Sequence, residues 1–598
     1  MNNQPASVLC LLSCICAAAV AASCAAPAGE LAVRPGRTAR AFQGVVVCRD
    51  GSPAAGALVT LTNLADLSDV VTVKADASGR FRAAVTSDRS AATATSPDEV
   101  AYVRNIDLAR AAGPIRLDVP CVGLTGQIQI LDAPAGGVVI HLARLSAESG
   151  DAFAAELRAD GQFDVCVPPG HYYAELPSAY VQRPNIASAP QAAPLTFRTT
   201  TRASLARSPE ANDGFSPLAK ASFASQVSAR VLAIGESDHG TREFSDERTR
   251  LALELARNGK LGLILIEAGY GEVLMLDRYI GGEVIDVKQA VQDLGYWPWD
   301  TYTFIESLEQ LRQYNSSVDE QRRIHIVGID VQSTAGAVDQ LTRGPAAIAA
   351  RTDAGPLVRL RERHGEEWKH FTELERSLVR ATLGRIAGLR DGLGVASNTN
   401  RDALAARSLS LHLDRLEAAD EWASLSVRDA GMSEMVLDVI ARQPDAQACI
   451  WAHLGHVARE DYIGSSSMGA HLAAALGTAY QVYGMFASAG STRAWDPQLK
   501  VGVIPHTLPA PPAGSLEAVL TRYAGAASVT YWRFDRATGG MARWLHGIHL
   551  VDQFGATYPG DRSVFVPMDL LAVDGAILFG RVAPSVPTPS GVRAARTR

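Results

Sequence analysis

The sequence predicts a multidomain protein in which two small antiparallel β-sandwiches precede an α/β domain with a mostly parallel sheet and a helical insertion. The first half is predicted from short alternating runs between Gly-rich turns and from motifs that recur at a constant offset. The second half is predicted from short aliphatic runs without alternation, which are typical of strands covered on both faces. A chain of 598 residues is long enough for several domains with their own cores.

The first 24 residues are predicted to be an export signal and not part of the fold. Residues 8–26 are apolar and small, too short and too rich in Ala and Cys for a membrane span, although no Lys or Arg precedes them. Ala21-Ala-Ser-Cys24 resembles a bacterial lipobox, and cleavage without a lipid is the alternative. We therefore expect an exported protein that is periplasmic, secreted or held at a membrane only through a lipidated Cys24.

The β-rich region that follows contains an internal repeat. Three pairs of residues share an offset of 82 positions: Gly44 and Gly126, Gly79 and Gly161, and Phe81 and Phe163. A constant offset indicates tandem domains. We expect β-sandwich 1 at residues 41–119, β-sandwich 2 at residues 120–198, and a linker at residues 199–220.

The first copy combines an opening strand, the turn Ser52-Pro-Ala-Ala-Gly56 and the motif Asp76-Ala-Ser-Gly-Arg-Phe81. This order resembles the carboxypeptidase regulatory-like family of prealbumin-type sandwiches. The resemblance implies spacer or adhesion modules, and a passive spacer is favoured over contact with cell-envelope material. His141 and His171 stand alone, so no catalytic cluster is expected in this region.

Charge and cysteine content argue against a nucleic-acid-binding protein and against a protein with a thiolate zinc site. The net charge is -7 and no basic stripe occurs, which argues against a nucleic-acid partner. A single disulfide among Cys48, Cys121 and Cys166 is compatible with export, whereas Cys449 is expected to be a buried core residue. No Cys-x-x-Cys occurs, so we expect no thiolate zinc site.

From residue 221 to residue 580 the sequence alternates between predicted strands and helices, with a helical insertion at about 345–445 and a disordered tail at 581–598. In the insertion, apolar residues recur at helical spacing and are expected in the core: Leu378, Val379, Leu383, Ile386, Leu409, Leu413 and Leu416. Four aliphatic runs end in a polar residue: Glu236, Glu267, Asp330 and His453. Ligands bind at the carboxyl ends of parallel strands, so we expect these four ends to converge on one site.

The most informative motif is Gly235-Glu-Ser-Asp-His239, followed by Arg242-Glu-Phe244. Together with later motifs it resembles the erythromycin esterase-like hydrolases, over roughly residues 225–580. The other matching segments are the strand-end Glu267, Tyr279 to Gly282, Arg312 to Asn315, Gly328 to Gln332, Arg428 to Glu434, Trp451 to Arg459 and Gly514 to Glu517. One departure is Leu454-Gly455, where the family commonly has Asn-Ala, and it bears on fine substrate contacts.

The resemblance implies hydrolysis of a small-molecule carboxylic ester or macrolactone, with five residues at the site: Glu236, His239, Glu267, His453 and His456. Such hydrolysis needs an activated water, a proton for the leaving alkoxide and stabilisation of the oxyanion. His239 is the best candidate for the base, oriented by Glu236 or Glu267. Arg242 and Arg248 are candidate oxyanion donors or charge partners.

Several residues near these motifs have a structural interpretation. Asp330 is a candidate at the substrate site, or simply the cap of a helix. Arg428 and Asp429 are expected to form a structural ion pair, and Trp297 and Trp299 to lie in the core.

Three alternative interpretations remain open. The same Glu/His cluster suits a divalent metal, although we favour a site without an obligatory cofactor. Gly235-Glu-Ser237-Asp-His239 imitates a nucleophile elbow, but the elbow needs glycine where His239 stands. In the third alternative, the sandwiches bind an envelope ligand and the α/β domain is a degenerate scaffold, which the intact Glu/His set argues against.

Overall fold

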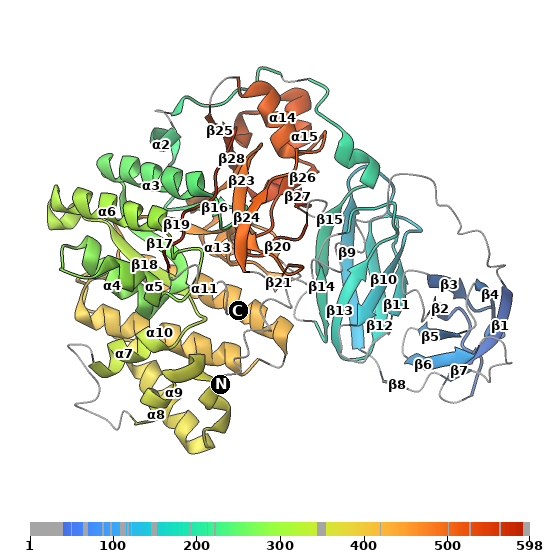
Figure 1. Ribbon diagram of the computed structural model, residues 1–598. Helices are drawn as coiled ribbons and strands as arrows, with labels where there is room; N and C mark the ends of the chain where they lie inside the picture. The colour runs from blue at the N-terminus through green and yellow to red at the C-terminus, as the bar shows by residue number, and fades with distance from the viewer. Residues whose placement is uncertain are drawn as a thin grey trace. The chain divides into compact units, whose positions relative to one another are not determined.

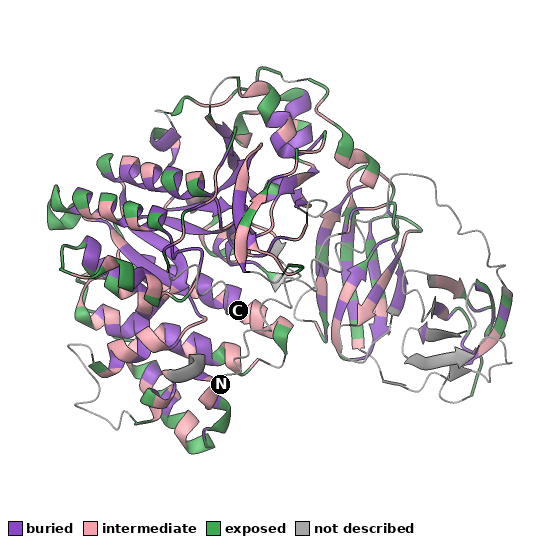
Figure 2. Ribbon diagram, in the orientation of Figure 1, coloured by how far each residue is buried: buried purple, intermediate pink, exposed green. Residues whose placement is uncertain are grey.

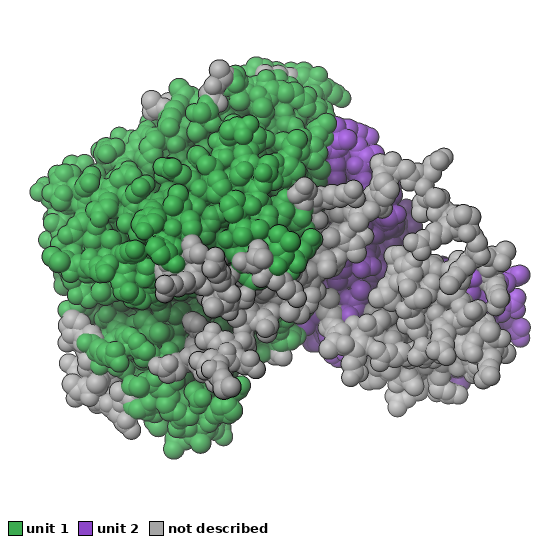
Figure 3. All heavy atoms as spheres, viewed as in Figure 1, with its two compact units in different colours: residues 1–17, 208–598 green, residues 18–207 purple. Residues whose placement is uncertain are grey.

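The computed structural model describes residues 40–589, apart from short internal segments. Those segments are residues 49–50, 64–69, 86–88, 96–98, 108–114, 117–118, 121, 145–151, 183–184, 192–193, 212, 221–222, 344–354, 419, 463–464, 500–501, 526–527 and 561–563. The predicted export signal with Cys24, and Cys121, therefore lie outside the described residues. The chain forms two compact units, one of residues 18–207 and one that contains residues 208–598 (Figure 3).

The described residues of the unit 18–207 form small β-sheets in which most neighbouring strands are antiparallel, as predicted. Its first part has the sheets β4-β1-β7 and β3-β2-β5-β6-β8. Their strands are β1 (Arg40–Val47), β2 (Leu58–Asn63), β3 (Val70–Lys74), β4 (Arg80–Val85), β5 (Arg89–Thr95), β6 (Glu99–Asp107), β7 (Ile115–Arg116) and β8 (Val119–Pro120). Side chains alternate between buried and exposed along β4, so one face of its sheet is covered.

The second part of this unit repeats the arrangement with the sheets β12-β9-β15 and β11-β10-β13-β14. Their strands are β9 (Val122–Ile130), β10 (Val139–Arg144), β11 (Ala152–Glu156), β12 (Gln162–Val167), β13 (Gly170–Glu175), β14 (Ile186–Ala189) and β15 (Leu195–Thr199). In both parts the opening strand pairs antiparallel with one neighbour and parallel with the other. Cys166 forms a disulfide, whereas Cys48 is free.

The repeated glycines and phenylalanines have a packing explanation. A Cβ atom at Gly44 would lie 2.5 Å from the Phe81 ring, and one at Gly126 would lie 2.6 Å from the Phe163 ring. Each phenylalanine packs over the glycine opposite it on the neighbouring strand. Both copies of the repeat therefore have a glycine at this position, because only a residue without a side chain leaves room for the phenylalanine ring.

The second unit is built on a seven-stranded sheet of order β18-β17-β19-β16-β22-β28-β25, parallel except for β25 against β28 (Figure 1). Its strands are β16 (Val231–Glu236), β17 (Leu261–Gly269), β18 (His325–Asp330), β19 (Gln447–His453), β22 (Tyr480–Ala487), β25 (Val529–Arg533) and β28 (Gly575–Phe579). Every residue of β16 and β19 is buried (Figure 2). This confirms the predicted mostly parallel sheet.

Helices cover both faces of the sheet because its strand residues point alternately into two apolar cores. Leu263 and Leu265 of β17 join one core, and Ile264 and Ile266 join the other. The helices outside the insertion are α2 (Phe223–Gln226), α3 (Arg242–Arg257), α4 (Tyr270–Ile280), α5 (Val287–Asp293), α6 (Tyr302–Ser316), α12 (Leu454–Val457), α13 (Met468–Leu476), α14 (Leu516–Tyr523) and α15 (Gly539–Leu545). Short strand pairs complete the unit: β20 (Asp461–Tyr462) with β21 (Ser465–Ser466), β23 (Ser491–Trp495) with β24 (Val503–Thr507), and β26 (Ile548–Asp552) with β27 (Phe565–Asp569).

The segment between β18 and β19 is helical. It comprises α7 (Ala335–Arg343), α8 (Gly355–Arg359), the 3-10 helix η5 (Glu362–His370), α9 (Glu373–Ala387), α10 (Asn398–Leu416) and α11 (Glu421–Arg442). Most of the apolar residues expected in its core are buried or partly buried, but the Leu378 side chain is 55% exposed, contrary to prediction. Leu378 lies on α9 beside the buried Val379, so helical spacing alone did not separate the two faces.

The C-terminal segment also differs from the prediction. Residues 581–589, expected to be disordered, are described and pair with the rest of the unit. Val582 bridges Gly490, Pro584 bridges Thr241, and the Ser585 amide donates to the Gly240 carbonyl at 2.7 Å. Backbone pairing orders a Pro-rich segment that carries no periodic signal in the sequence. None of the described helices has the length and apolar character needed to cross a membrane.

Candidate active site

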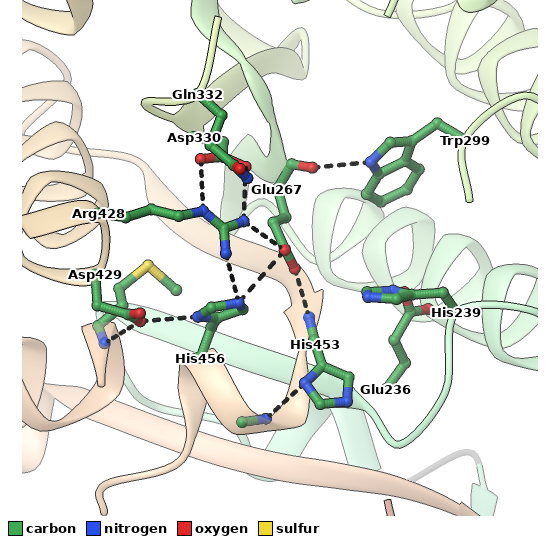
Figure 4. Close-up of polar contacts among 12 residues, drawn as sticks. Glu236, His239, Glu267, Trp299, Asp330, Gln332, Arg428, Asp429, His453 and His456 are labelled. Carbon is green, nitrogen blue, oxygen red and sulfur yellow. Dashed lines mark hydrogen bonds and ion pairs between the residues drawn. The ribbon is translucent and has the colours of Figure 1, made fainter. Parts of the chain in front are cut away.

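Four neighbouring strands deliver polar side chains to the same edge of the sheet. In the order β18, β17, β19, β16, they contribute Asp330, Glu267, His453 and Glu236 (Figure 4). Glu236 and His453 are paired in the parallel register of β16 and β19. The structure thus brings together the strand ends that the sequence analysis selected.

Glu236 and His239 form a hydrogen-bonded pair. The Nδ1 atom of His239 lies 2.8 Å from Oε1 of Glu236, and the side chains are 7% and 4% exposed. The other carboxylate oxygen, Oε2, accepts a hydrogen bond of 2.7 Å from Nη1 of Arg248. A carboxylate at Nδ1 makes this nitrogen the donor, which leaves Nε2 of the neutral ring with its lone pair.

Arg248 is buried between aromatic side chains of the α/β unit. It is 3% exposed, and its guanidinium carbon lies 4.8 Å from the ring centroid of Trp299 and 5.3 Å from that of Trp451. Trp299 is itself in the core and donates from Nε1 to the Glu267 carbonyl at 2.9 Å. Arg248 is therefore a buried charge partner of Glu236, one of the two roles expected for it.

Arg428 of α11 joins three of the site's side chains. Its Nε and Nη2 atoms donate to Asp330 at 3.0 and 2.7 Å, and Nη2 also donates to Glu267 at 2.9 Å. Burial raises the pKa of Glu267, but His456 in its protonated form and Arg428 lower it by more, so the net pKa is below its ordinary value. The pKa of Asp330 is lowered too, since Arg428 outweighs the effect of burial.

His456 connects Arg428 to Asp429. Its Nδ1 atom lies 2.8 Å from Oδ1 of Asp429, and its Nε2 atom lies 3.0 Å from Nη1 of Arg428. Because a guanidinium has only donors, Nε2 accepts in the neutral ring and Nδ1 donates. Burial lowers the pKa of His456, but Asp429 and Glu267 raise it by more, so the ring gains a proton more readily than an ordinary histidine.

His453 lies opposite His239, with 5.2 Å between the ring centroids. Its backbone amide donates to Oε2 of Glu267 at 2.9 Å, and its Nδ1 accepts from the Gly455 amide at 3.2 Å. Burial, and then the neighbouring His239 and His456, lower the pKa of His453 well below its ordinary value. His453 therefore favours the neutral imidazole form beside the His239–Glu236 pair.

Two groups of buried acids support the loop that carries His239. Asp238 accepts hydrogen bonds from the Gly240 amide at 2.9 Å and from the Thr241 hydroxyl at 3.0 Å, and burial raises its pKa to about 6. Glu517 accepts from the Asp552 amide at 2.7 Å, and burial raises its pKa to about 7. The segment after Asp552 donates two backbone hydrogen bonds to the Ser237 carbonyl, at 3.0 and 3.3 Å.

Other candidates fall outside the cluster or have another role. Arg242 is exposed and pairs with Asp246 at 3.5 Å, because it is the first residue of α3 and points along that helix. Ser237 is 0% exposed, and its hydroxyl has no hydrogen-bond partner among the described residues. Asp330 binds Arg428 through both carboxylate oxygens, so it is not the simple helix cap that was one of the two roles expected for it.

Sequence reasoning missed the central position of Arg428 and Asp429. They were expected to pair with each other, but Arg428 binds Glu267 and Asp330 while Asp429 binds His456. Adjacent residues on a helix point in different directions, so they rarely face each other. The signal that could have located them is their place in a motif of the family that the sequence resembles.

The sequence model of the erythromycin esterase family matches residues 262–581, more than half of the 598 residues. The chain belongs to the erythromycin esterase family. Glu267, Asp330, Arg428, His453 and His456 lie inside the matched range, whereas Glu236 and His239 precede it. The family supports assignment of the chain as a hydrolase of the family's type.

Solved structures with the same fold include a Bacillus cereus protein with a TM-score of 0.54 and 18% identity, over 62% of this chain and 96% of that one. A succinoglycan biosynthesis protein matches with a TM-score of 0.52 and 16% identity, over 62% of this chain and 95% of that one. A mutant of the erythromycin esterase EreC in its open conformation matches at 15% identity, over 60% of this chain and 92% of that one, with a TM-score of 0.40. The first two matches show that the α/β unit has a known fold.

Proposed function

We propose that the protein hydrolyses a carboxylic ester or lactone with a water molecule activated by His239. The observation that carries the proposal is the hydrogen bond of 2.8 Å between His239 Nδ1 and Glu236. It orients the ring and stabilises the imidazolium that forms when Nε2 takes a proton. Arg248 supports this arrangement by holding the second oxygen of Glu236 at 2.7 Å.

In the proposed reaction, water attacks the ester carbonyl carbon and gives one proton to Nε2 of His239. The carbonyl π pair moves to oxygen and forms a tetrahedral oxyanion. When the intermediate collapses, the bond to the leaving oxygen breaks and that oxygen takes a proton from the imidazolium. The products are a carboxylic acid and an alcohol, or a hydroxy acid from a lactone.

The remaining site residues are assigned to positioning. Glu267, Asp330, Arg428 and His456 form a buried network in which each carboxylate has a guanidinium or imidazole partner. The network holds the His453 backbone through Oε2 of Glu267. It thereby keeps the strand ends rigid beside His239, as a preorganised site requires.

The test of this function is a screen of the purified protein against simple esters, lactones and macrolides, with the His239→Ala variant as background. The proposal expects turnover of at least one carboxylic ester by the parent only. Absence of turnover across the panel would contradict it and favour the degenerate scaffold.

The same screen, repeated after dialysis of the protein against a strong chelator, separates this proposal from the metal-dependent alternative. Among the described residues, no group of three or more His, Cys, Asp and Glu side chains is arranged to hold a metal ion. We expect activity to survive dialysis against a strong chelator. Loss of activity that returns with zinc or manganese would instead assign Glu236, His239 and Glu267 to a metal centre.

We further propose that the protein is exported, with Cys24 as the candidate lipidation site and the sandwiches as passive spacers. The support is the apolar stretch of residues 8–26 and the sequence Ala21-Ala-Ser-Cys24. Mass spectrometry of the mature N-terminus tests both points. A chain that retains residues 1–24 would contradict export through this signal.

A further inference from the structure

The loop between α5 and α6 carries a group of aromatic residues to the site. Gly295 adopts a φ of +68°, a left-handed conformation that suits glycine, and Tyr296, Trp297 and Trp299 follow it. The Trp299 indole donates to the Glu267 carbonyl, so the end of this loop is attached to strand β17. The loop therefore holds Tyr296 in a defined position relative to Glu267.

The Tyr296 ring meets His239 edge to face, with 5.9 Å between the ring centroids and 74° between the planes. Unlike the tryptophans beside it, Tyr296 is only partly buried. Within the described part of the chain its hydroxyl has no hydrogen-bond partner, and it is not among the side-chain atoms sealed from solvent. The hydroxyl is thus available to a molecule bound beside His239.

The charges around Tyr296 keep its hydroxyl protonated. Burial is the largest cause of a pKa well above the ordinary value, and Glu267, Asp330 and Glu236 raise it further, against the opposing effect of Arg428. A neutral phenol is a hydrogen-bond donor. The same carboxylates would repel a phenolate, so donation without proton loss is the favoured role.

The two arginines of the site are poorly placed to serve as the oxyanion donor. Arg428 uses Nε and Nη2 on Asp330 and Glu267, and Nη1 contacts His456. Arg248 is 3% exposed and lies between two tryptophans. Tyr296 offers a donor that is both accessible and next to the proposed base.

We propose that the Tyr296 hydroxyl donates a hydrogen bond to the ester carbonyl oxygen and stabilises it as it becomes the tetrahedral oxyanion. The inference rests on the proposed function, since it assigns a donor to that reaction. Tyr296 keeps its proton throughout, and the proton of the attacking water passes to His239 and then to the leaving oxygen. The role requires the hydroxyl and not the ring alone.

The test is Tyr296→Phe, which keeps the ring against His239 and removes only the oxygen. We expect kcat to fall by about 10²-fold with little change in KM, as for the loss of other oxyanion donors. Affinity for a phosphonate, which imitates the tetrahedral anion, should fall by a comparable factor. Tyr302→Phe is the matched control, because that ring is 40% exposed and begins α6, and it should retain parental kinetics.

The outcomes separate this inference from the function on which it rests. An active parent whose Tyr296→Phe variant keeps its kcat and phosphonate affinity would overturn the role of Tyr296 and leave the esterase proposal standing. A rise in KM alone, with kcat unchanged, would also overturn it, because that pattern marks ground-state binding. A parent protein that hydrolyses no ester would overturn both.

Discussion

Replacement of Arg428 by methionine tests whether the buried network organises the site. The methionine side chain would preserve an unbranched apolar stem but leave Glu267 and Asp330 without their cation. The side chains of Arg428, Glu267 and Asp330 are 11%, 3% and 7% exposed, so water can replace the guanidinium only in part. Removing one partner from a buried ion pair costs about 3–5 kcal/mol, and we expect the free energy of unfolding at neutral pH to fall by that amount.

Urea unfolding followed by tryptophan fluorescence measures this loss in the relevant unit. All eight tryptophans lie in residues 297–544, so the signal reports on the α/β unit alone. Arg278→Met is the matched control: its partner is Glu283, and the two side chains are 43% and 49% exposed. An exposed pair contributes at most about 1 kcal/mol. If Arg428→Met cost no more than this control, the network would not be what holds the site.

The pH dependence of the Arg428→Met effect has a definite sign. In the parent, the lowered pKa values of Glu267 and Asp330 contribute stability that is present above their ordinary values of 4.5 and 3.8 and is lost as the pH falls. The variant lacks the cation, so the difference between the two proteins should be largest near neutral pH and shrink in acid. Adding Asp330→Asn to the variant should recover about 1 kcal/mol or more, since the two positions are coupled.

Three further predictions concern other parts of the molecule. The Glu517→Gln variant should gain stability relative to the parent as the pH rises, because the pKa of Glu517 is raised from 4.5 to about 7. Ionisation of Glu517 across that window costs the parent roughly 3 kcal/mol of folding free energy. Chemical denaturation at acid and alkaline pH measures the difference, and equal unfolding curves for the two proteins would contradict it. The Gly126→Val variant should make the unit of residues 18–207 susceptible to proteolysis, since a Cβ atom at position 126 would lie 2.4 Å from the Leu195 carbonyl oxygen and 2.6 Å from the Phe163 ring. Resistance to protease equal to that of the parent would show that the close packing of Phe163 on Gly126 is not needed. A chain of residues 208–598 should remain soluble and retain the parental kcat on any substrate found, because these residues form their own hydrophobic cores. Aggregation or loss of activity would show that the sandwiches are needed.

The sequence predicted what depends on local patterns. Runs of apolar residues located β16, β17, β18 and β19, and the polar residue after each run located the edge of the sheet where they meet. The offset of 82 positions located the repeated β-module, since the same glycine and phenylalanine contact recurs in both copies. These features follow from periodicity and strand ends, which a single sequence displays.

Contacts between distant segments could not be predicted in the same way. Arg428 reaches Asp330 across 98 positions and Glu267 across 161 positions, and nothing local marks it as their partner. The segment from Val582 to Thr588 is ordered by pairing with Gly240, Gly490 and Asp300, far from it in the chain. Arg242 and Arg248 look equivalent in the sequence, but α3 turns the first toward solvent and buries the second against Glu236.

Water activation by His239 is tested most directly by comparing kcat/KM for His239→Ala and Ser237→Ala on the best ester found in the screen. Both residues lie in the same loop, so the pair controls for disturbance of its backbone. We expect kcat/KM to fall by about 10²–10⁴-fold for His239→Ala, the usual contribution of a general base, and to change little for Ser237→Ala. Full activity in His239→Ala, or an equal loss in Ser237→Ala, would contradict water activation by His239.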